Sequence, residues 1–260
     1  MDLKCQQEVI EKLESCKDSN IHSLIIYGSS GSGKSYLAKR YADILDVSDF
    51  YLIHPKVTEI RDVIEECSQI NSNVVLCIEN LDTGVFAASS ALLKFLEEPA
   101  HNVYIVVTAR NLKLIQETII SRSYVVGVNI PTKGDLVLYA EDTYPEEYRL
   151  YNNRDIWNCV QTFEDVNTVL AMNSTQIQYI EELPELCLKS KCISDTLWSL
   201  QKYPENLGDT PINLTIRYIM YKQPKLLYSG INCIRSLEQK RIADYVILTK
   251  FLFEFKGVSI

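Results

Sequence analysis

The chain has 260 residues, enough for one large domain or two to three small ones, with an ordinary globular composition of 47% hydrophobic and 23% charged residues. A formal net charge of −8 argues against a protein that coats nucleic acid without sequence preference, since that needs a broad basic surface. Eight scattered cysteines without a C-x-x-C pair, and three histidines, favour neither a zinc site nor a disulfide framework. No apolar run is membrane-length and no basic-then-apolar stretch follows Met1, so we expect no membrane span, no signal peptide and a cytoplasmic location.

The first predicted elements are a helix and a strand. Leu3 to Cys16 carries Val9, Ile10 and Leu13 among charged residues, which is typical of an amphipathic helix. The apolar run Leu24 to Tyr27 then predicts a short buried strand.

A glycine-rich loop follows this strand and leads into a helical pattern. It fits the P-loop spacing G-x-x-x-x-G-K-[ST] with Gly28, Ser29, Ser30, Gly31, Ser32, Gly33, Lys34 and Ser35. In such a loop the backbone N–H groups surround a phosphate, the lysine reaches the outer phosphates and the last hydroxyl binds Mg²⁺. Glycine is needed because a side chain would keep the backbone away from the ligand. We therefore expect a nucleotide-binding site here.

Further apolar runs predict a sheet. The candidate strands are Asp49 to Ile53, Val74 to Ile78, Val103 to Val107, and the stretches around Ile115 to Ile120 and Tyr124 to Val128. Uninterrupted runs of this kind are typical of strands buried on both faces of a parallel sheet. Helical patterns at Val57 to Ile70 and Phe86 to Glu98 separate them, so we expect a doubly wound α/β fold.

After Ile130 and Pro131 the strand-like runs stop and helical patterns continue to the end. We place a boundary there, with an α/β domain over 1–130 and helical domains over 131–174 and 175–260. Prolines and glycines, among them Pro184 and Gly230, are expected to separate the helices.

Polar residues directly after a buried strand are candidates for chemistry. Glu79 follows Val74 to Ile78 and could hold Mg²⁺ from the side of the sheet. Asn80 comes next, where an ATPase needs a carboxylate to polarise the attacking water; an amide can orient water but cannot take its proton. Asp82 lies two residues further on. The alternative is a polar cap between the strand and the next helix.

Thr108 and Arg122 carry weaker signals. Thr108 ends a strand and would lie beside the γ-phosphate if that strand neighbours the P-loop strand, but threonine is common at strand ends. Arg122 precedes the last strand, where it could reach another subunit's nucleotide as an arginine finger. Without further support, a solvated arginine is the simpler interpretation.

Several segments together resemble a known family. They are VTEIRDVI at 57–64, ASSALLKFLEEP at 88–99, the strand that ends in Thr108, and TIISRS at 118–123. Over about residues 3–130 the chain closely resembles the clamp-loader branch of the AAA+ ATPases, including the gamma and delta-prime subunits of bacterial DNA polymerase III.

This resemblance implies a role for each candidate residue. It places the Walker A motif at Gly28 to Ser35, the Walker B aspartate at Glu79, the catalytic glutamate at Asn80, sensor 1 at Thr108, the trans-acting arginine finger at Arg122 and sensor 2 at Arg154. It also implies a P-loop AAA+ core followed by a small helical lid over 131–174 and a short helical collar over 175–260.

The implied function is that of a clamp-loader subunit. Such a subunit binds ATP and Mg²⁺, joins other subunits in a hetero- or homo-oligomeric ring, and helps to open and load a sliding clamp onto primed DNA. The amide of Asn80 puts hydrolysis by this subunit in doubt, because the family has a carboxylate there. The alternatives are an ATP-binding but non-hydrolysing, delta-prime-like ring subunit, or an unrelated P-loop phosphotransferase.

Overall fold

The computed structural model describes residues 6–19, 21–70, 72–84, 86–97, 101–189, 212–238, 247–248 and 250–252. The chain divides into two compact units, Met1–Asp135 and Leu136–Ile260. The domain ranges expected from the sequence, including a lid and a collar within the second unit, stay predictions.

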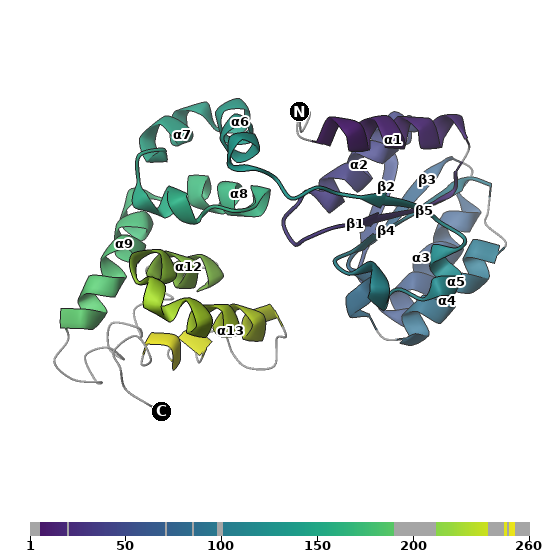
Figure 1. Cartoon of the computed structure of the whole chain (residues 1–260). Coiled ribbons are helices and arrows are strands. Elements are labelled where there is room, and N and C mark those ends of the chain that lie inside the picture. Colours follow the sequence, from purple (N-terminus) through teal and green to yellow (C-terminus); the bar gives the residue numbers. More distant parts are fainter. Residues whose placement is uncertain are drawn as a thin grey trace. The chain divides into compact units, whose positions relative to one another are not determined.

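The first unit is a parallel sheet between two layers of helices, as Figure 1 shows. Its strands are β1 (Ser23–Tyr27), β2 (Asp49–Ile53), β3 (Val74–Ile78), β4 (Val103–Ala109) and β5 (Tyr124–Gly127). Its helices are α1 (Gln7–Asp18), α2 (Lys34–Ile44), α3 (Val57–Gln69), α4 (Phe86–Glu97) and α5 (Glu117–Ile120), with 3₁₀ turns η2 (Leu81–Thr83) and η3 (Leu112–Leu114). The strand order is β2-β3-β4-β1-β5 and every pair is parallel, which confirms the predicted doubly wound α/β fold.

Hydrophobic residues of the strands face both helical layers. Leu24 and Ile26 of β1 pack in one cluster with α1 and α2, whereas Ile25 between them packs in the other cluster with α3 and α4. All of β3 is buried, as expected for a strand that is covered on both faces. Because the strands are parallel, the carboxyl ends of β1, β3 and β4 meet at one edge of the sheet. That edge holds Gly28, Glu79 and Thr108.

One predicted strand is wrong. The stretch from Ile115 to Ile120 contains the helical turn α5, preceded by η3, and it adds no strand to the sheet. Ile119 of α5 is buried, and so is Ile115, which has an extended backbone between η3 and α5. A short stretch with a few apolar residues fits either structure by composition alone.

The second unit is helical in its described part. It contains α6 (Lys133–Thr143), which begins just before the boundary, and α7 (Pro145–Tyr151), η4 (Asp155–Cys159), α8 (Phe163–Ala171), α9 (Ser174–Lys189), α12 (Ile212–Lys222), η5 (Pro224–Leu226) and α13 (Leu227–Glu238). The helical character predicted after Pro131 is confirmed for these segments. Much of the chain beyond Lys189 and beyond Glu238 lies outside the described residues.

A buried ion pair joins η4, α8 and α12 in this unit. The Arg217 guanidinium donates to Asp165 Oδ2 at 2.8 Å and to the Cys159 carbonyl at 3.0 Å, and the Arg217 and Asp165 side chains are about 10% exposed or less. Asp165 also accepts hydrogen bonds from the N–H groups of Gln161 and Thr162, and the Thr162 hydroxyl accepts one from the Asp165 N–H, which forms a capping box at the start of α8. The carboxylate therefore serves both the helix terminus and the ion pair.

Two residues that were expected to separate helices lie inside them. Pro184 is a buried residue within α9. Gly230 lies within α13, and a Cβ built there would come within 2.1 Å of the Met220 sulfur in α12. Glycine at this position allows two helices to pack closely, a role that the sequence pattern does not distinguish from a helix end.

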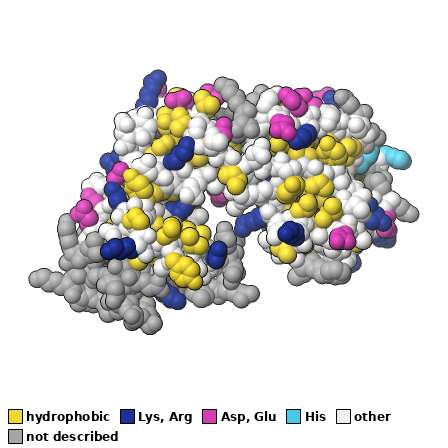
Figure 2. All heavy atoms as spheres, viewed as in Figure 1, with side chains coloured by type: hydrophobic (Ala, Val, Ile, Leu, Met, Phe, Trp, Pro, Cys, Tyr) yellow, Lys and Arg dark blue, Asp and Glu magenta, His cyan; other side chains and the backbone are white. Residues whose placement is uncertain are grey.

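The distribution of charged side chains on the surface agrees with the net negative charge of the sequence (Figure 2). On the face of the described residues in Figure 2, basic and acidic side chains are interspersed, and that face has no continuous basic surface. Five cysteines whose side chains the structure describes are buried free thiols: Cys16, Cys67, Cys77, Cys159 and Cys233. None of the described helices is both long and apolar enough to span a membrane.

Candidate nucleotide-binding site

The loop between β1 and α2 has a backbone that requires its glycines. Gly31 and Gly33 adopt left-handed conformations with φ of 69° and 91°, which residues with a Cβ rarely adopt. At Gly28, a Cβ would lie 2.9 Å from the carbonyl oxygen of Val128, the residue after β5. The loop can therefore bring its backbone close to a bound group, as a phosphate cradle must.

Lys34 lies at the first position of α2 with its side chain turned into the loop. It is 7% exposed, and its Nζ donates to the carbonyl oxygens of Gly28 at 3.1 Å and Ser29 at 2.7 Å. The Ser32 hydroxyl also donates to the Ser29 carbonyl, at 2.9 Å. The positive charge thus lies within the loop, where it would face the outer phosphates of a nucleotide.

The two predicted Mg²⁺ ligands are in contact. The Ser35 hydroxyl donates a hydrogen bond to the Glu79 carboxylate. Glu79 is held in place after β3 by its own N–H, which donates to the Ile53 carbonyl of β2 at 2.9 Å. A hydroxyl and a carboxylate are oxygen ligands of the kind that Mg²⁺ takes, so this pair fits the ion.

Asn80 and Thr108 are brought together by a backbone contact. The Asn80 N–H donates to Thr108 Oγ1 at 2.9 Å, and Thr108 is 1% exposed. Asn80 has a left-handed backbone with φ of 49°, a conformation that asparagine tolerates better than most residues. The Asn80 carbonyl accepts hydrogen bonds from Thr83, which continues the chain into η2. The Thr108 hydroxyl therefore fixes the chain next to Glu79.

Asp82 contacts the loop that follows β4 and does not add a further candidate group to Glu79 and Asn80. Its Oδ2 accepts from the N–H groups of Arg110 at 3.1 Å and Asn111 at 3.0 Å, directly after β4. In β3, burial raises the pKa of the Cys77 thiol far above its ordinary value, and the nearby Glu79 carboxylate adds to the effect. Cys77 is therefore a neutral core residue.

Arg122 lies at the opposite edge of the sheet from the P-loop. Tyr124, two residues later, pairs with Leu24 at the start of the parallel pair β1 and β5, whereas the P-loop follows the end of β1. The guanidinium donates to the Thr118 carbonyl at 2.9 Å and to Glu97 Oε1 at 3.1 Å. Arg122 thus cannot reach the P-loop of its own chain.

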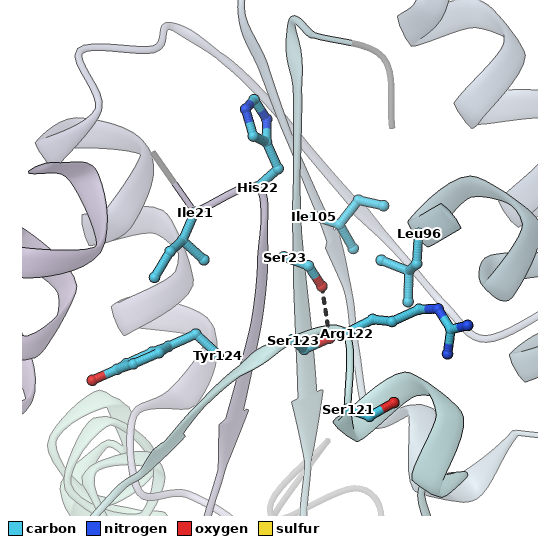
Figure 3. Close-up of a pocket in the computed structure, with 9 residues that line it drawn as sticks. All are labelled: Ile21, His22, Ser23, Leu96, Ile105, Ser121, Arg122, Ser123 and Tyr124. Carbon is cyan, nitrogen blue, oxygen red and sulfur yellow. Dashed lines mark hydrogen bonds between the residues drawn. The ribbon is translucent and has the colours of Figure 1, made fainter. Parts of the chain in front are cut away.

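A cavity of about 410 Å³ opens beside Arg122. Figure 3 shows the Ser23 and Ser123 hydroxyls facing each other, with their oxygens 2.7 Å apart, while the Arg122 guanidinium points away from them toward Leu96 of α4. The polar groups of this cavity therefore do not converge on one point.

Arg154, the predicted sensor 2 residue, belongs to the second unit, directly before η4. Its guanidinium pairs with the Glu181 carboxylate of α9 at 2.9 Å. Its role toward a nucleotide stays a prediction.

Sequence reasoning named Asp82 but not its contact, and it missed Glu97 and Gln6. The contacts of Asp82 and Glu97 depend on loops and helix ends distant in sequence, and of the two only Glu97 lies in a family-like segment. Gln6, ahead of α1, is 1% exposed and its Nε2 donates to the Asn129 carbonyl at 3.0 Å. A single polar residue before an amphipathic pattern carries no signal of its own.

The sequence comparison points to one family. Residues 49–131 match the family model described as DNA polymerase III, delta subunit. A curated relative, DNA polymerase III subunit delta' of Haemophilus influenzae, is 32% identical over 78 residues, which is 30% of this chain and 24% of the relative. The match thus spans about a quarter of the relative's length, and the P-loop lies ahead of the range that the family model covers.

Solved structures share the fold. A DNA polymerase III gamma subunit-related protein of Thermotoga maritima matches 95% of this chain and 98% of its own, with a TM-score of 0.59 and 14% identity. The RuvB Holliday junction branch migration motor of Thermotoga maritima matches 81% of this chain and 74% of its own, with a TM-score of 0.51 and 14% identity. The mixed α/β structure with its five-stranded parallel sheet is therefore an AAA+ P-loop ATPase fold. Sequence and structure together confirm that the chain resembles the AAA+ clamp-loader ATPases, and in particular the delta-prime and gamma subunits of DNA polymerase III.

Proposed function

We propose that this protein is a clamp-loader subunit that binds Mg·ATP, joins related subunits in an oligomeric ring, and helps to open and load a sliding clamp onto primed DNA in the cytoplasm. The likeness of residues 49–131 to DNA polymerase III subunits supports the role in replication. The contact between Ser35 and Glu79 carries the nucleotide-binding part, because it joins a hydroxyl and a carboxylate next to the buried Lys34 ammonium.

Each group of the loop has one task in this proposal. The left-handed Gly31 and Gly33 let backbone N–H groups turn toward the phosphates. Lys34 gives up its carbonyl contacts for the outer phosphates, which are stronger partners for an ammonium because they are charged. Ser35 and Glu79 would hold Mg²⁺, which neutralises phosphate charge; because that ion keeps part of its water shell, a glutamate can replace the shorter aspartate.

Hydrolysis by this subunit is slow in our proposal. Asn80 follows Glu79 at the place where a carboxylate would take a proton from water, and its amide has no comparable proton affinity. Asp82 is tied to the loop after β4, where its Oδ2 accepts hydrogen bonds from the N–H groups of Arg110 and Asn111. The nucleotide then serves mainly to hold the subunit in its assembled state.

Assembly would use the opposite edge of the sheet. Arg122 lies there and is able to act only on a nucleotide of another subunit, as an arginine finger does. The second unit supplies the lid over 131–174, with Arg154 as sensor 2, and the collar over 175–260. These assignments rest on the family resemblance.

Calorimetry of Mg·ATP binding to the wild-type protein, Lys34→Ala and Lys39→Ala tests the proposal. Lys34→Ala removes the ammonium from the loop and should weaken binding about 100-fold, whereas Lys39 is an exposed residue of the same helix and its substitution should change the affinity less than twofold. An affinity of Lys34→Ala within threefold of wild type would reject the phosphate cradle. Light scattering with and without ATP, alone and with sister subunits, separates a ring subunit from a self-contained phosphotransferase, which need not assemble.

A further inference from the structure

β2 is an outermost strand of the sheet, and among the described strands it pairs with β3 alone. On that side the Ile53 carbonyl accepts from the Glu79 N–H at 2.9 Å. Successive residues of a strand direct their N–H and C=O groups to opposite sides, so Ile53 and Tyr51 serve β3. Phe50 and Leu52 then direct theirs to the outer side of β2. That side offers donors and acceptors to a further strand.

The outer side of β2 lacks the features that usually protect such a strand from other chains, which are charged residues, prolines and bulges. The run from Phe50 to Ile53 contains no charged residue and no proline. The pairing of Asp49–Ile53 with β3 runs without a bulge. Leu52 is 50% exposed, more than any other residue of β2. The strand is therefore suited to pairing with a strand of another chain.

We propose that β2 pairs antiparallel with β2 of a second copy of this chain, about a two-fold axis at Tyr51. In this register Phe50 of one copy faces Leu52 of the other, and the two residues exchange their N–H···O=C hydrogen bonds. The axis repeats the same exchange on the other side of Tyr51, because a two-fold contact uses one patch of surface twice.

The side chains select this register. Registers that keep the hydrogen bonds pair outward-facing residues with one another. An axis at Phe50 would set the exposed Leu52 against Ser48, and an axis at Leu52 would set Phe50 against His54. With the axis at Tyr51, apolar Leu52 is covered by apolar Phe50 in both halves of the contact. Tyr51 then faces its own copy in a pair without hydrogen bonds, where side chains approach most closely.

The same axis matches opposite charges beyond the ends of the strand. Asp46 and Lys56 are both exposed, and they stand at equal distances in sequence from Tyr51, one before β2 and one after it. Lys56 of one copy therefore comes opposite Asp46 of the other. The outer side of β2 is thus complementary to itself in hydrogen bonding, apolar contact and charge, which identifies a second copy as the partner. This contact requires no nucleotide and is separate from the ring assembly proposed above.

Sedimentation equilibrium of the full chain in EDTA, without nucleotide, tests the contact. Wild type should dimerise with a Kd of about 100 μM or below, as expected for a small interface. Leu52→Lys sets an ammonium against Phe50 and should weaken dimerisation about tenfold or more. Lys56→Glu sets a carboxylate against Asp46 and should weaken it about fivefold, a ratio that falls toward one in about 0.5 M salt. Leu114→Lys is the matched control, since Leu114 is a 64% exposed leucine of η3, and should change the Kd less than about twofold.

Thermal unfolding far below the Kd checks that each variant is folded, independently of dimerisation. A wild-type chain that stays monomeric up to about 500 μM would overturn the inference. A Leu52→Lys dimer as tight as that of wild type would also overturn it, because the copies would then meet elsewhere. An unchanged Kd for Lys56→Glu at low salt would overturn the register about Tyr51. None of these results bears on the proposed nucleotide binding, which calorimetry of Lys34→Ala tests by itself.

Discussion

The Ser35 hydroxyl donates to the Glu79 carboxylate, so the residue that ends the P-loop and the residue that follows β3 are in contact. In the sheet, β4 lies between β1 and β3. The contact therefore reaches across the end of β4, and the extra methylene of glutamate over aspartate contributes to that reach. A side chain in this position can share an ion with the P-loop hydroxyl.

Removing either partner should make nucleotide binding less dependent on Mg²⁺. We expect Glu79→Gln and Ser35→Ala each to weaken Mg·ATP binding about tenfold, because each removes one oxygen ligand, while binding of ATP in EDTA changes less than about twofold. The double variant should lose less than the sum of the two, since both act through one ion. Calorimetry measures the affinities of the wild type, the two single variants and the double variant. Glu65→Gln, which changes an exposed carboxylate of α3, is the control. Additive losses would show that the two residues act independently.

Asn80→Glu should raise ATP hydrolysis in the presence of partner subunits. The substitution supplies the carboxylate that a general base requires, and a gain of about tenfold or more is expected. It should also destabilise the protein by about 1 kcal/mol, because Asn80 has a left-handed backbone that glutamate tolerates less well. Phosphate release and thermal unfolding measure the two effects.

Asn73→Glu, at an exposed position just before β3, controls for the added charge. It should change neither the rate of ATP hydrolysis nor the thermal stability. A wild-type kcat above ~1 s⁻¹, at the low end of ordinary enzymes, would contradict the proposed slow turnover and show that another group serves as base.

Most of the first unit could be predicted from the sequence because its three central strands, β1, β3 and β4, are short apolar runs buried on both faces. The contact of Ser35 with Glu79 follows from the same reasoning, since the P-loop that leads to Ser35 begins directly after β1 and Glu79 comes directly after the parallel strand β3. The stretch at Ile115 to Ile120 could not be assigned, because a six-residue stretch with three isoleucines fits a strand or a helical turn equally well.

The finer parts of the site depend on loop conformations, which the periodicity of apolar residues in the sequence does not predict. The hydrogen bond from the Asn80 N–H to Thr108 requires the left-handed backbone of Asn80, and Asp82 reaches the loop after β4 only because η2 turns it there. Gln6 meets Asn129 across 123 residues of sequence, a contact set by the packing of α1 beside β5. Contacts of this kind follow from tertiary packing and not from local pattern.

Arg122→Ala should lower the ATPase rate of a neighbouring subunit and leave nucleotide binding to its own subunit unchanged. The residue lies at the opposite edge of the sheet from its own P-loop, and removal of such a finger costs about 10³ to 10⁵ in rate in well-studied NTPases. Mixed assemblies that contain Arg122→Ala and wild-type sister subunits, compared by phosphate release, show the effect. Arg61→Ala, an exposed arginine of α3, should have none. A loss of affinity for Mg·ATP in isolated Arg122→Ala would contradict a role in trans.

The ion pair between Asp165 and Arg217 should stabilise the second unit in a pH-dependent way. Burial alone would raise the pKa of Asp165, but the hydrogen bonds and charge of Arg217, with the N–H of Gln161, outweigh it and hold the pKa below its ordinary value of 3.8. Because the folded-state pKa is lower than the unfolded one, the carboxylate contributes fully above about pH 4. That contribution is lost as the pH falls through the folded-state value.

Arg217→Met leaves this carboxylate buried without its cation and should cost about 3 to 5 kcal/mol at pH 7, as measured by urea unfolding. Tryptophan fluorescence reports on the second unit, because both tryptophans of the chain, Trp157 and Trp198, fall within its residue range. The difference from wild type should shrink as the pH falls below about 4, since a protonated Asp165 no longer needs the cation. Arg149→Met removes one partner of an exposed ion pair in α7 and should change the free energy of unfolding by less than about 0.5 kcal/mol. A cost for Arg217→Met that stays constant from pH 7 to pH 3 would show that Arg217 acts through packing and not through the charge of Asp165.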